Sequence, residues 1–332
     1  MADLFKGIGA VVSTQLLSRA LTFLLNVLVA RLASPSAYGV GYVSLQLLSN
    51  LALFFAKEGF RKVGLRSSTE DLGLQSSMNL AWMGATSAAV LAGPLAAYWL
   101  RSTHSASMGY QGAVILVALA SVVEGLAEPF VVLTLAAQNF QRRAVGEAGA
   151  ILARTVGMLL LTLAFDDVPL AFGASQMIYA VVWLGWFASP FLQDSDRWKP
   201  ATLSKGIVSD YHWTLGKEFA GMVVLKLALT EGEKILLLAL FTEQQWGVFG
   251  LVSNLGSIVL RLLFAPIEEI GYSVFSASSL DPQKPERRQA LVSLLRALLL
   301  LQGGVGWLGC CFGPSFSETA VRILYGQEWA AS

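Results

Sequence analysis

Charged residues are scarce in this chain of 332 residues. Lys, Arg, Asp and Glu together make up 14% of it, whereas a soluble domain carries about 25%. Hydrophobic residues account for 55%, and the mean hydropathy is +0.60. The net charge of +1 argues against nucleic acid as a partner, because that partner attracts strongly basic surfaces. With long apolar runs recurring throughout, this composition predicts an all-α polytopic membrane protein.

Residues that build disulfides, metal sites and soluble-enzyme active sites are also few. Cys310 and Cys311 are adjacent in an apolar run, so we do not expect a disulfide framework. His104 and His212 stand far apart, without the spacing of a metal site. A GxGxxG match at 304–309 lies inside an apolar run, where close helix packing explains it, and the chain has no GxxxxGK[ST] loop. We therefore expect no enzyme activity, no cofactor and no metal.

Nine apolar segments are each long enough to cross about 30 Å of hydrocarbon at about 1.5 Å per residue. They are residues 8–33, 38–56, 78–100, 112–135, 147–165, 168–190, 215–241, 245–275 and 290–312. The seventh carries several charges, and an interfacial amphipathic helix is the alternative for it. Under the nine-span order the most basic loops all fall on one side of the membrane, which predicts a cytosolic N-terminus.

The chain also repeats itself. A shift of 208 positions places RLASPSAYGVGYVSLQLLSNL on ALFTEQQWGVFGLVSNLGSIV without a gap, so that residues 38–40 meet residues 246–248. Chance similarity between two apolar segments is the alternative. Six predicted spans separate the copies, and this even number predicts a parallel repeat around a central cavity. The two lobes would be residues 1–205, with a cytosolic linker from about 191, and an incomplete lobe at 206–332.

Ionisable side chains lie within or beside several predicted spans. Each costs at least about 2.5–3.5 kcal/mol at the bilayer centre unless it faces a cavity or a partner. The cations that we expect to line a cavity and bind an anionic head group are Arg19, Lys57, Arg61, Lys62, Arg154 and Arg261. The expected cavity carboxylates are Glu124, Glu128, Glu231, Glu233, Glu268 and Glu269. Structural ion pairing is the alternative for each residue alone, whereas a hydrated cavity lined by both signs fits the set.

Spacing groups some of these residues on common helix faces. Lys57 and Arg61 are four residues apart, and so are Glu124 and Glu128. Side chains with this spacing lie one above the other on a helix. Pro129 directly follows the second pair and is able to kink its helix. The sequence thus places two cations on one helix face and two carboxylates on another.

Four segments carry a resemblance to a known family. LTFLLNVLVARLASPSAYGV, LFFAKEGFRKVGLRS, EPFVVLTLAAQNF and LTEGEKILLLALFTEQQWGVFGLVSNLGSIVLRLLFAPIEE resemble the Rft1 family of the MOP superfamily, which includes MATE exporters and bacterial lipid-linked sugar flippases. AKEGFRK, TEGEK and the stretch from Asn254 to Glu269 are the most specific parts. The resemblance implies a MOP/MATE-like two-lobe helical bundle. Because the flippase branch usually has fourteen helices, it also implies that this chain, with about nine, is C-terminally truncated.

The resemblance further implies a function in the endoplasmic-reticulum membrane. That function is translocation of dolichol-diphosphate-linked oligosaccharide for protein N-glycosylation, or support of that step, with membrane lipids and glycosylation-pathway proteins as further partners. Arg19 and Arg261 resemble, by helix and face, the essential cavity arginines of the superfamily's lipid flippases. A non-transporting scaffold or accessory factor of dolichol-linked oligosaccharide assembly is the alternative. A MATE-like exporter of small solutes is a weaker one, because the arginines argue against cationic cargo.

Overall fold

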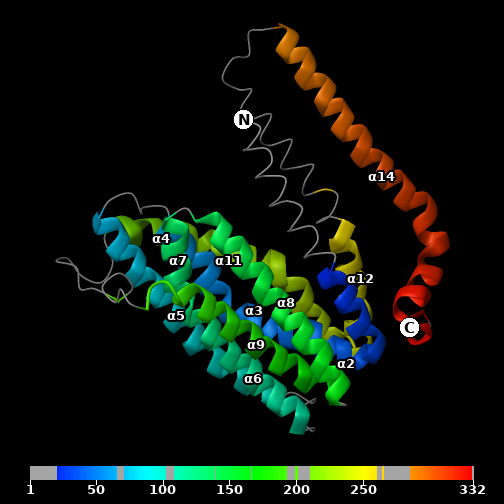
Figure 1. Cartoon of the computed structure of the whole chain (residues 1–332), viewed down its shortest axis with the longest axis horizontal. Helices are drawn as coiled ribbons and strands as arrows, with labels where there is room; N and C mark the ends of the chain where they lie inside the picture. Colours follow the sequence, from blue (N-terminus) through cyan, green and yellow to red (C-terminus); the bar gives the residue numbers. More distant parts are fainter. Residues whose placement is uncertain are drawn as a thin grey trace. The chain divides into compact units, whose positions relative to one another are not determined.

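The protein is described here by a computed structural model. It describes residues 21–65, 71–101, 108–137, 139–165, 167–192, 199–200, 210–259, 264 and 285–330. The described part consists of helices and short connections, and it contains no strand (Figure 1). This confirms the expected all-α fold.

The helices follow one another with few interruptions. A short apolar helix at Leu21–Leu32 precedes a continuous helical run made of α2 (Pro35–Gly39), η1 (Val40–Leu45), α3 (Gln46–Phe54), η2 (Phe55–Phe60) and α4 (Arg61–Leu65). Then come α5 (Asp71–Leu100), α6 (Met108–Leu126), α7 (Glu128–Ala136), α8 (Phe140–Ala164) and α9 (Val168–Ala188). The chain continues with α11 (Asp210–Leu240), α12 (Glu243–Val259), α14 (Pro285–Tyr325) and α15 (Gln327–Ala330). η1 and η2 are π-helical turns, which occur often near functional sites.

Six helical stretches in the described part are long and apolar enough to cross a membrane. They are Pro35–Leu65, Gln75–Leu100, Met108–Ala136, Gln141–Ala164, Val168–Ala188 and Leu291–Tyr325. Each coincides with a segment predicted from the sequence, which confirms a polytopic membrane protein. The predicted seventh segment is a helix of 31 residues, α11, but its charges keep it out of this set. The first and eighth segments fall partly outside the described residues, so the count of nine stays a prediction.

Polar caps and prolines begin several of these helices. The Ser34 hydroxyl accepts a hydrogen bond from the backbone N–H of Ala37, and Pro35 follows it at the first helical position. Asn139 caps α8, and Asp167 caps α9 by accepting from Leu170 N at 3.0 Å. Such side chains satisfy backbone donors that have no partner inside the helix. The boundaries are therefore set by local sequence.

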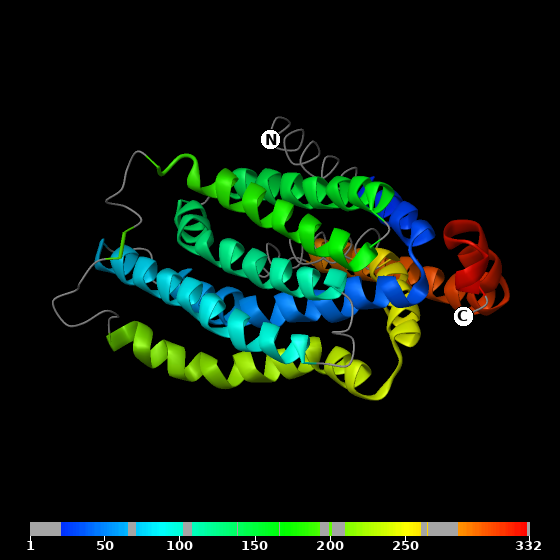
Figure 2. The same cartoon turned by 90° about the horizontal axis from the view of Figure 1, so that it is seen from below.

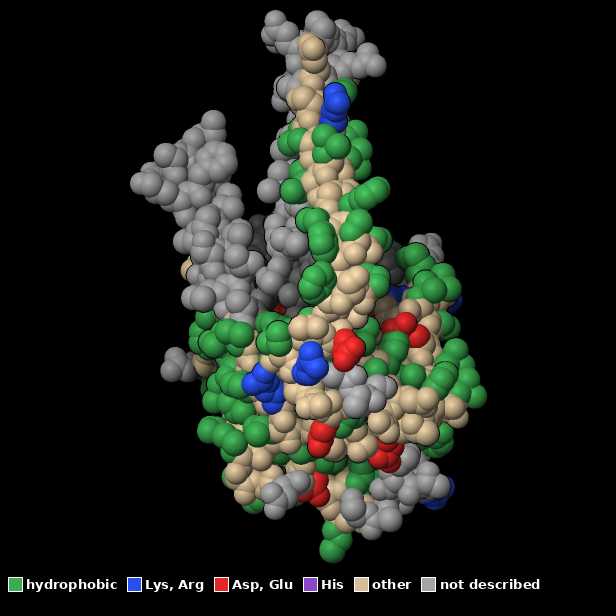
Figure 3. All heavy atoms as spheres, turned by 90° about the vertical axis from the view of Figure 1, so that its right-hand side faces the viewer, with side chains coloured by type: hydrophobic (Ala, Val, Ile, Leu, Met, Phe, Trp, Pro, Cys, Tyr) green, Lys and Arg blue, Asp and Glu red, His purple; other side chains and the backbone are tan. Residues whose placement is uncertain are grey.

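The described residues form two compact units, one within Met1–Gly247 and the other within Val248–Ser332. In the first unit, α6 packs against α9 and α5, α8 packs against α9, and α11 packs along α3, η2 and α4 (Figures 1 and 2). One core cluster joins α7, α8 and α9 through Phe130, Ala150 and Trp183. In the second unit, hydrophobic side chains are exposed along α14 (Figure 3). Trp307 and Phe312 are among the exposed ones.

Contacts at the two ends of the first unit show in which direction its helices run. Leu65, Leu135 and Phe191 belong to one cluster, so the ends of α4, α7 and α9 lie together. At the other end, the Trp99 indole donates to the Ser44 hydroxyl at 3.0 Å. Consecutive helices therefore run in alternating directions. The assignment of the first end to the cytosol stays a prediction.

The two copies of the sequence repeat touch each other reciprocally. A Cβ added at Gly39 would overlap the backbone of Glu243 and Gly247, and a Cβ added at Gly247 would overlap the backbone of Pro35. The 208-residue shift relates Gly39 to Gly247 and Pro35 to Glu243. All four residues lie within the first compact unit, and a two-fold relation between the two lobes stays a prediction. The glycines allow the first turns of α2 and α12 to approach this closely.

Candidate functional site

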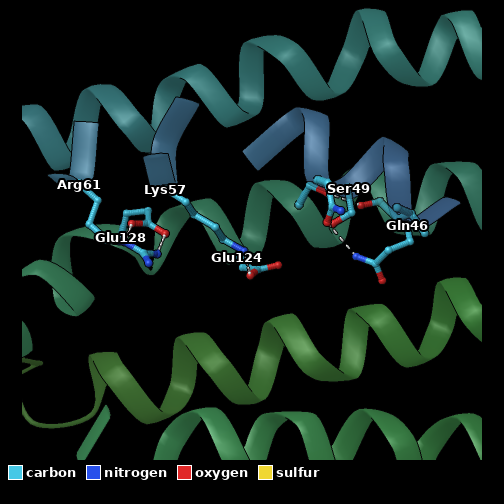
Figure 4. A network of polar contacts seen from close by, with 9 residues as sticks. Gln46, Ser49, Lys57, Arg61, Glu124 and Glu128 are labelled. Carbon is cyan, nitrogen blue, oxygen red and sulfur yellow. Dashed lines mark hydrogen bonds and ion pairs between the residues drawn. The ribbon is translucent and has the colours of Figure 1, made fainter. Parts of the chain in front are cut away.

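Two parallel ion pairs cross the interior of the first unit. Lys57 Nζ lies 2.6 Å from Glu124 Oε1. Arg61 binds both oxygens of Glu128, with Nε 2.7 Å from Oε2 and Nη2 on Oε1. Figure 4 shows the two cations reaching from η2 and α4 toward carboxylates on α6 and α7. The two cations, four residues apart on one helix, thus pair with two carboxylates that are four residues apart on the other side. We call these two ion pairs, Lys57–Glu124 and Arg61–Glu128, the ladder.

The carboxylates of this ladder are almost fully enclosed. The Glu124 side chain is 2% exposed and the Glu128 side chain 1% exposed. A carboxylate buried to this extent needs a partner, because an isolated charge in a low-dielectric interior is very costly. The bidentate geometry at Arg61 is also the strongest arrangement available to an arginine. These pairs therefore hold the Pro35–Leu65 helix against α6 and α7, and they neutralise both cations.

A second cluster joins α4 to α11 nearer the surface. The Glu58 Oε2 atom lies 2.5 Å from Lys62 Nζ and 2.5 Å from Lys226 Nζ. All three side chains are partly exposed, with exposed fractions of 25% for Glu58, 49% for Lys62 and 43% for Lys226. One carboxylate is therefore shared by two ammonium groups that come from different helices.

A row of polar side chains crosses from α8 through α3 to α11. Gln46 donates to Asn50 Oδ1 at 3.0 Å, and Asn50 donates to Glu231 Oε1 at 2.9 Å. Lys234 completes the row with an ion pair to Glu231 at 2.9 Å. At its other end, Arg154 Nη2 donates to Gln46 Oε1 at 2.8 Å. The row places hydrogen-bonding groups across helices that are otherwise apolar.

Arg154 differs from the other predicted cations that the structure describes. Its guanidinium contacts the Gln46 amide and lies 4.9 Å from the centre of the Phe172 ring. Among the described residues it forms no ion pair with a carboxylate, although it is half-buried within Gln141–Ala164. An arginine in this setting has donors left for a planar or tetrahedral anion.

The predicted site residues are only partly brought together. Lys57, Arg61, Glu124 and Glu128 form the ladder, while Lys62, Arg154 and Glu231 belong to the neighbouring clusters. Glu233 is exposed and forms no ion pair within the described part of the chain. Arg19, Arg261, Glu268 and Glu269 lie outside the described residues, and their placement in a cavity stays a prediction.

Sequence reasoning missed the two amides that connect the clusters. Gln46 and Asn50 contact Arg154 and Glu231. Their signal was present, since two amides four residues apart in an apolar span face the same side of the helix. The partner of Glu58 could not be predicted from residue spacing, because Lys226 lies 168 positions further along the chain.

Comparisons with known proteins place the chain in a family. The family model described as Rft protein matches residues 3–332. Proteins named Man(5)GlcNAc(2)-PP-dolichol translocation protein RFT1 from Xenopus tropicalis and Mus musculus are each 30% identical over 344 residues, which cover 94% of this chain and 63% of theirs. The one from Saccharomyces cerevisiae is 23% identical over 380 residues, covering 96% and 65%. The chain thus spans less than two thirds of the length of these relatives, and no solved structure matches it significantly. On the family match over nearly its whole length, the chain belongs to the Rft protein family.

Proposed function

We propose that this chain acts in the translocation of a dolichol-diphosphate-linked oligosaccharide across the endoplasmic-reticulum membrane, or supports that step. The relatives' names give the class of cargo, Man(5)GlcNAc(2)-PP-dolichol. The six apolar stretches give the membrane setting. Cytosolic placement of the N-terminus, the two lobes at 1–205 and 206–332 and their rocking around a shared cavity belong to the same proposal.

The observation that carries the proposal is the set of contacts that Arg154 makes. Ladder cations have carboxylate partners, whereas among the described residues the Arg154 guanidinium contacts an amide and an aromatic ring and forms no ion pair with a carboxylate. A cation in an apolar span is expensive unless it faces water or an anion. A diphosphate offers the anion, and arginine binds phosphate oxygens through two parallel hydrogen bonds.

The charge balance of the surrounding network supports the same cargo. Its cations are Lys57, Arg61, Lys62, Arg154, Lys226 and Lys234, and its carboxylates are Glu58, Glu124, Glu128 and Glu231. Among the described residues of this network, six cations against four carboxylates leave a net charge of +2. A positive surplus inside a membrane protein favours an anionic ligand and disfavours a cationic solute.

These contacts give the residues different roles in binding the head group. Gln46 fixes the Arg154 guanidinium by accepting one of its hydrogen bonds. Lys57 and Arg61 keep the Pro35–Leu65 helix in place, so that Gln46 stays in register with α8. Arg19 and Arg261 would add further phosphate contacts, and the polyprenyl tail would remain in lipid.

Reconstitution into vesicles tests the proposal. A short-chain Man5GlcNAc2-diphosphate lipid is loaded into one leaflet, and mannose that becomes accessible to an added lectin measures headgroup translocation. We expect Arg154→Gln to lower the rate about tenfold or more, as loss of a charge-assisted contact implies. Arg143→Gln, on the same helix, is the matched control and should keep the rate. An unchanged rate in Arg154→Gln would remove Arg154 from the mechanism, and wild-type vesicles no faster than empty ones would favour the scaffold function.

A further inference from the structure

The cluster of Glu58, Lys62 and Lys226 has the geometry of an anion site that is filled by the protein's own carboxylate. Each lysine nitrogen lies 2.5 Å from the same oxygen, Glu58 Oε2, so the two nitrogens are at most 5.0 Å apart. Two ammonium groups this close repel each other, and an anion between them relieves the repulsion. The cluster as a whole keeps a charge of +1.

Exposure separates this cluster from the buried ladder. Glu58 is 25% exposed and its lysines 43–49% exposed, whereas Glu124 and Glu128 are at most 2% exposed. Partly exposed ion pairs contribute little to stability, whereas breaking a buried pair is strongly destabilising. A ligand with more negative charge than one carboxylate is therefore able to displace Glu58, and the ladder carboxylates are not displaceable in this way.

The two lysines belong to different helices. Lys62 lies on α4 and Lys226 on α11, so the Glu58 carboxylate holds these helices together at this level. A phosphate oxygen that replaced Glu58 would take over both contacts. The cluster lies on the Pro35–Leu65 helix toward its end at Leu65, which is the end where Leu135 and Phe191 also gather.

We propose that Lys62 and Lys226 form a binding site for a phosphate-bearing amphiphile, and that Glu58 occupies this site as an internal competitor until the phosphate displaces it. A diphosphate is preferred over a single phosphate because it brings more charge to the two ammonium groups. The choice of a polyprenyl diphosphate as the natural occupant rests on the proposed function. The anion site itself rests on the contacts of Glu58.

Equilibrium binding tests the proposal without any transport step. The purified chain in phosphatidylcholine nanodiscs is titrated with farnesyl diphosphate, a short polyprenyl diphosphate. Removal of the competitor in Glu58→Gln should tighten binding about three- to tenfold, and Lys226→Gln or Lys62→Gln should weaken it about tenfold. Glu147→Gln is the control, because it removes an exposed carboxylate that forms no ion pair within the described residues. Its affinity should stay within about twofold of wild type.

Two further binding measurements distinguish a polyprenyl diphosphate from free pyrophosphate and from an anionic membrane lipid. Inorganic pyrophosphate should compete with farnesyl diphosphate more weakly than unlabelled lipid does. Nanodiscs containing phosphatidylserine should weaken binding only slightly if the diphosphate is preferred, and strongly if the site takes any anionic headgroup, which would overturn that preference. Unchanged or weaker binding in Glu58→Gln would overturn the internal competitor. Should Glu58→Gln fail to fold, Glu58→Asp, which draws the carboxylate back by one methylene, must still tighten binding.

These results remain separable from those of the proposed function. Loss of translocation in Arg154→Gln together with unaltered binding in Glu58→Gln would leave the function standing and remove the anion site. Tighter binding in Glu58→Gln together with wild-type vesicles that translocate no faster than empty ones would do the reverse.

Discussion

Arg61 and Arg154 lie in the same compact unit, in two apolar stretches, and they have different surroundings. Arg61 is clamped by both oxygens of the buried Glu128. Arg154 has an amide partner and an aromatic ring, and no carboxylate among the described residues. The difference shows that a charge inside a membrane helix is not by itself a sign of a ligand site. A matched counter-ion indicates a structural brace, and a missing one indicates a place for an anion.

Removal of the Glu128 charge should have the largest effect on stability. Glu128→Gln leaves Arg61 enclosed without its counter-ion, which in a buried pair costs about 3–5 kcal/mol. We expect a marked fall of the unfolding midpoint in detergent, followed by tryptophan fluorescence. The double variant Arg61→Gln/Glu128→Gln should recover part of the loss. If the single variant were as stable as wild type, Arg61 would not be a brace.

Glu124→Gln should lower the free energy of unfolding less than Glu128→Gln does, although it breaks the neighbouring ion pair. Lys57 is 34% exposed and Arg61 only 13%, so the Lys57 ammonium is less enclosed by the protein when its partner is lost. A loss of about 1–3 kcal/mol is expected, since the carboxylate is buried and the lysine is partly screened. Chemical denaturation of both variants in the same micelles gives the comparison. A larger loss in Glu124→Gln than in Glu128→Gln would show that exposure of the cation does not set the cost.

Arg154→Gln should change stability little while it impairs ligand binding. The variant gives up one charge-assisted hydrogen bond and one cation–π contact, together about 1–2 kcal/mol, and it removes a charge that has no ion-pair partner among the described residues. These terms oppose each other, so the unfolding midpoint should move by a few degrees at most. A fall as large as that of Glu128→Gln would place Arg154 among the braces.

Glu233→Gln should have the smallest effect of the four. The side chain is exposed and forms no ion pair in the described part of the chain, although it stands two residues from the buried Glu231. Surface substitutions of this kind stay within about 0.5 kcal/mol. Unfolding midpoints of Glu233→Gln and Glu231→Gln, measured side by side, check this. An equal loss in both would contradict the exposed position of Glu233.

The sequence predicted the parts of the fold that rest on local patterns. Apolar run length identified the six stretches that are long and apolar enough to cross a membrane. The predicted repeat aligns Gly39 with Gly247, but the close approach of α2 and α12 at these glycines was not predicted. The four-residue spacings identified both faces of the ladder. Which face meets which was not predictable, because Lys57 and Glu124 are 67 positions apart. That pairing depends on how the helices pack, and hydropathy carries no information about it.

The headgroup translocation rate of two variants in the vesicle assay tests the central distinction most directly. One variant is Arg154→Gln, and the other is Lys57→Gln/Glu124→Gln, which removes a cation together with its counter-ion. If Arg154 holds the anion, the rate should fall about tenfold or more in the first and stay within about threefold of wild type in the second. An equal fall in both, or a larger fall in the second, would contradict the distinction between bracing and binding cations.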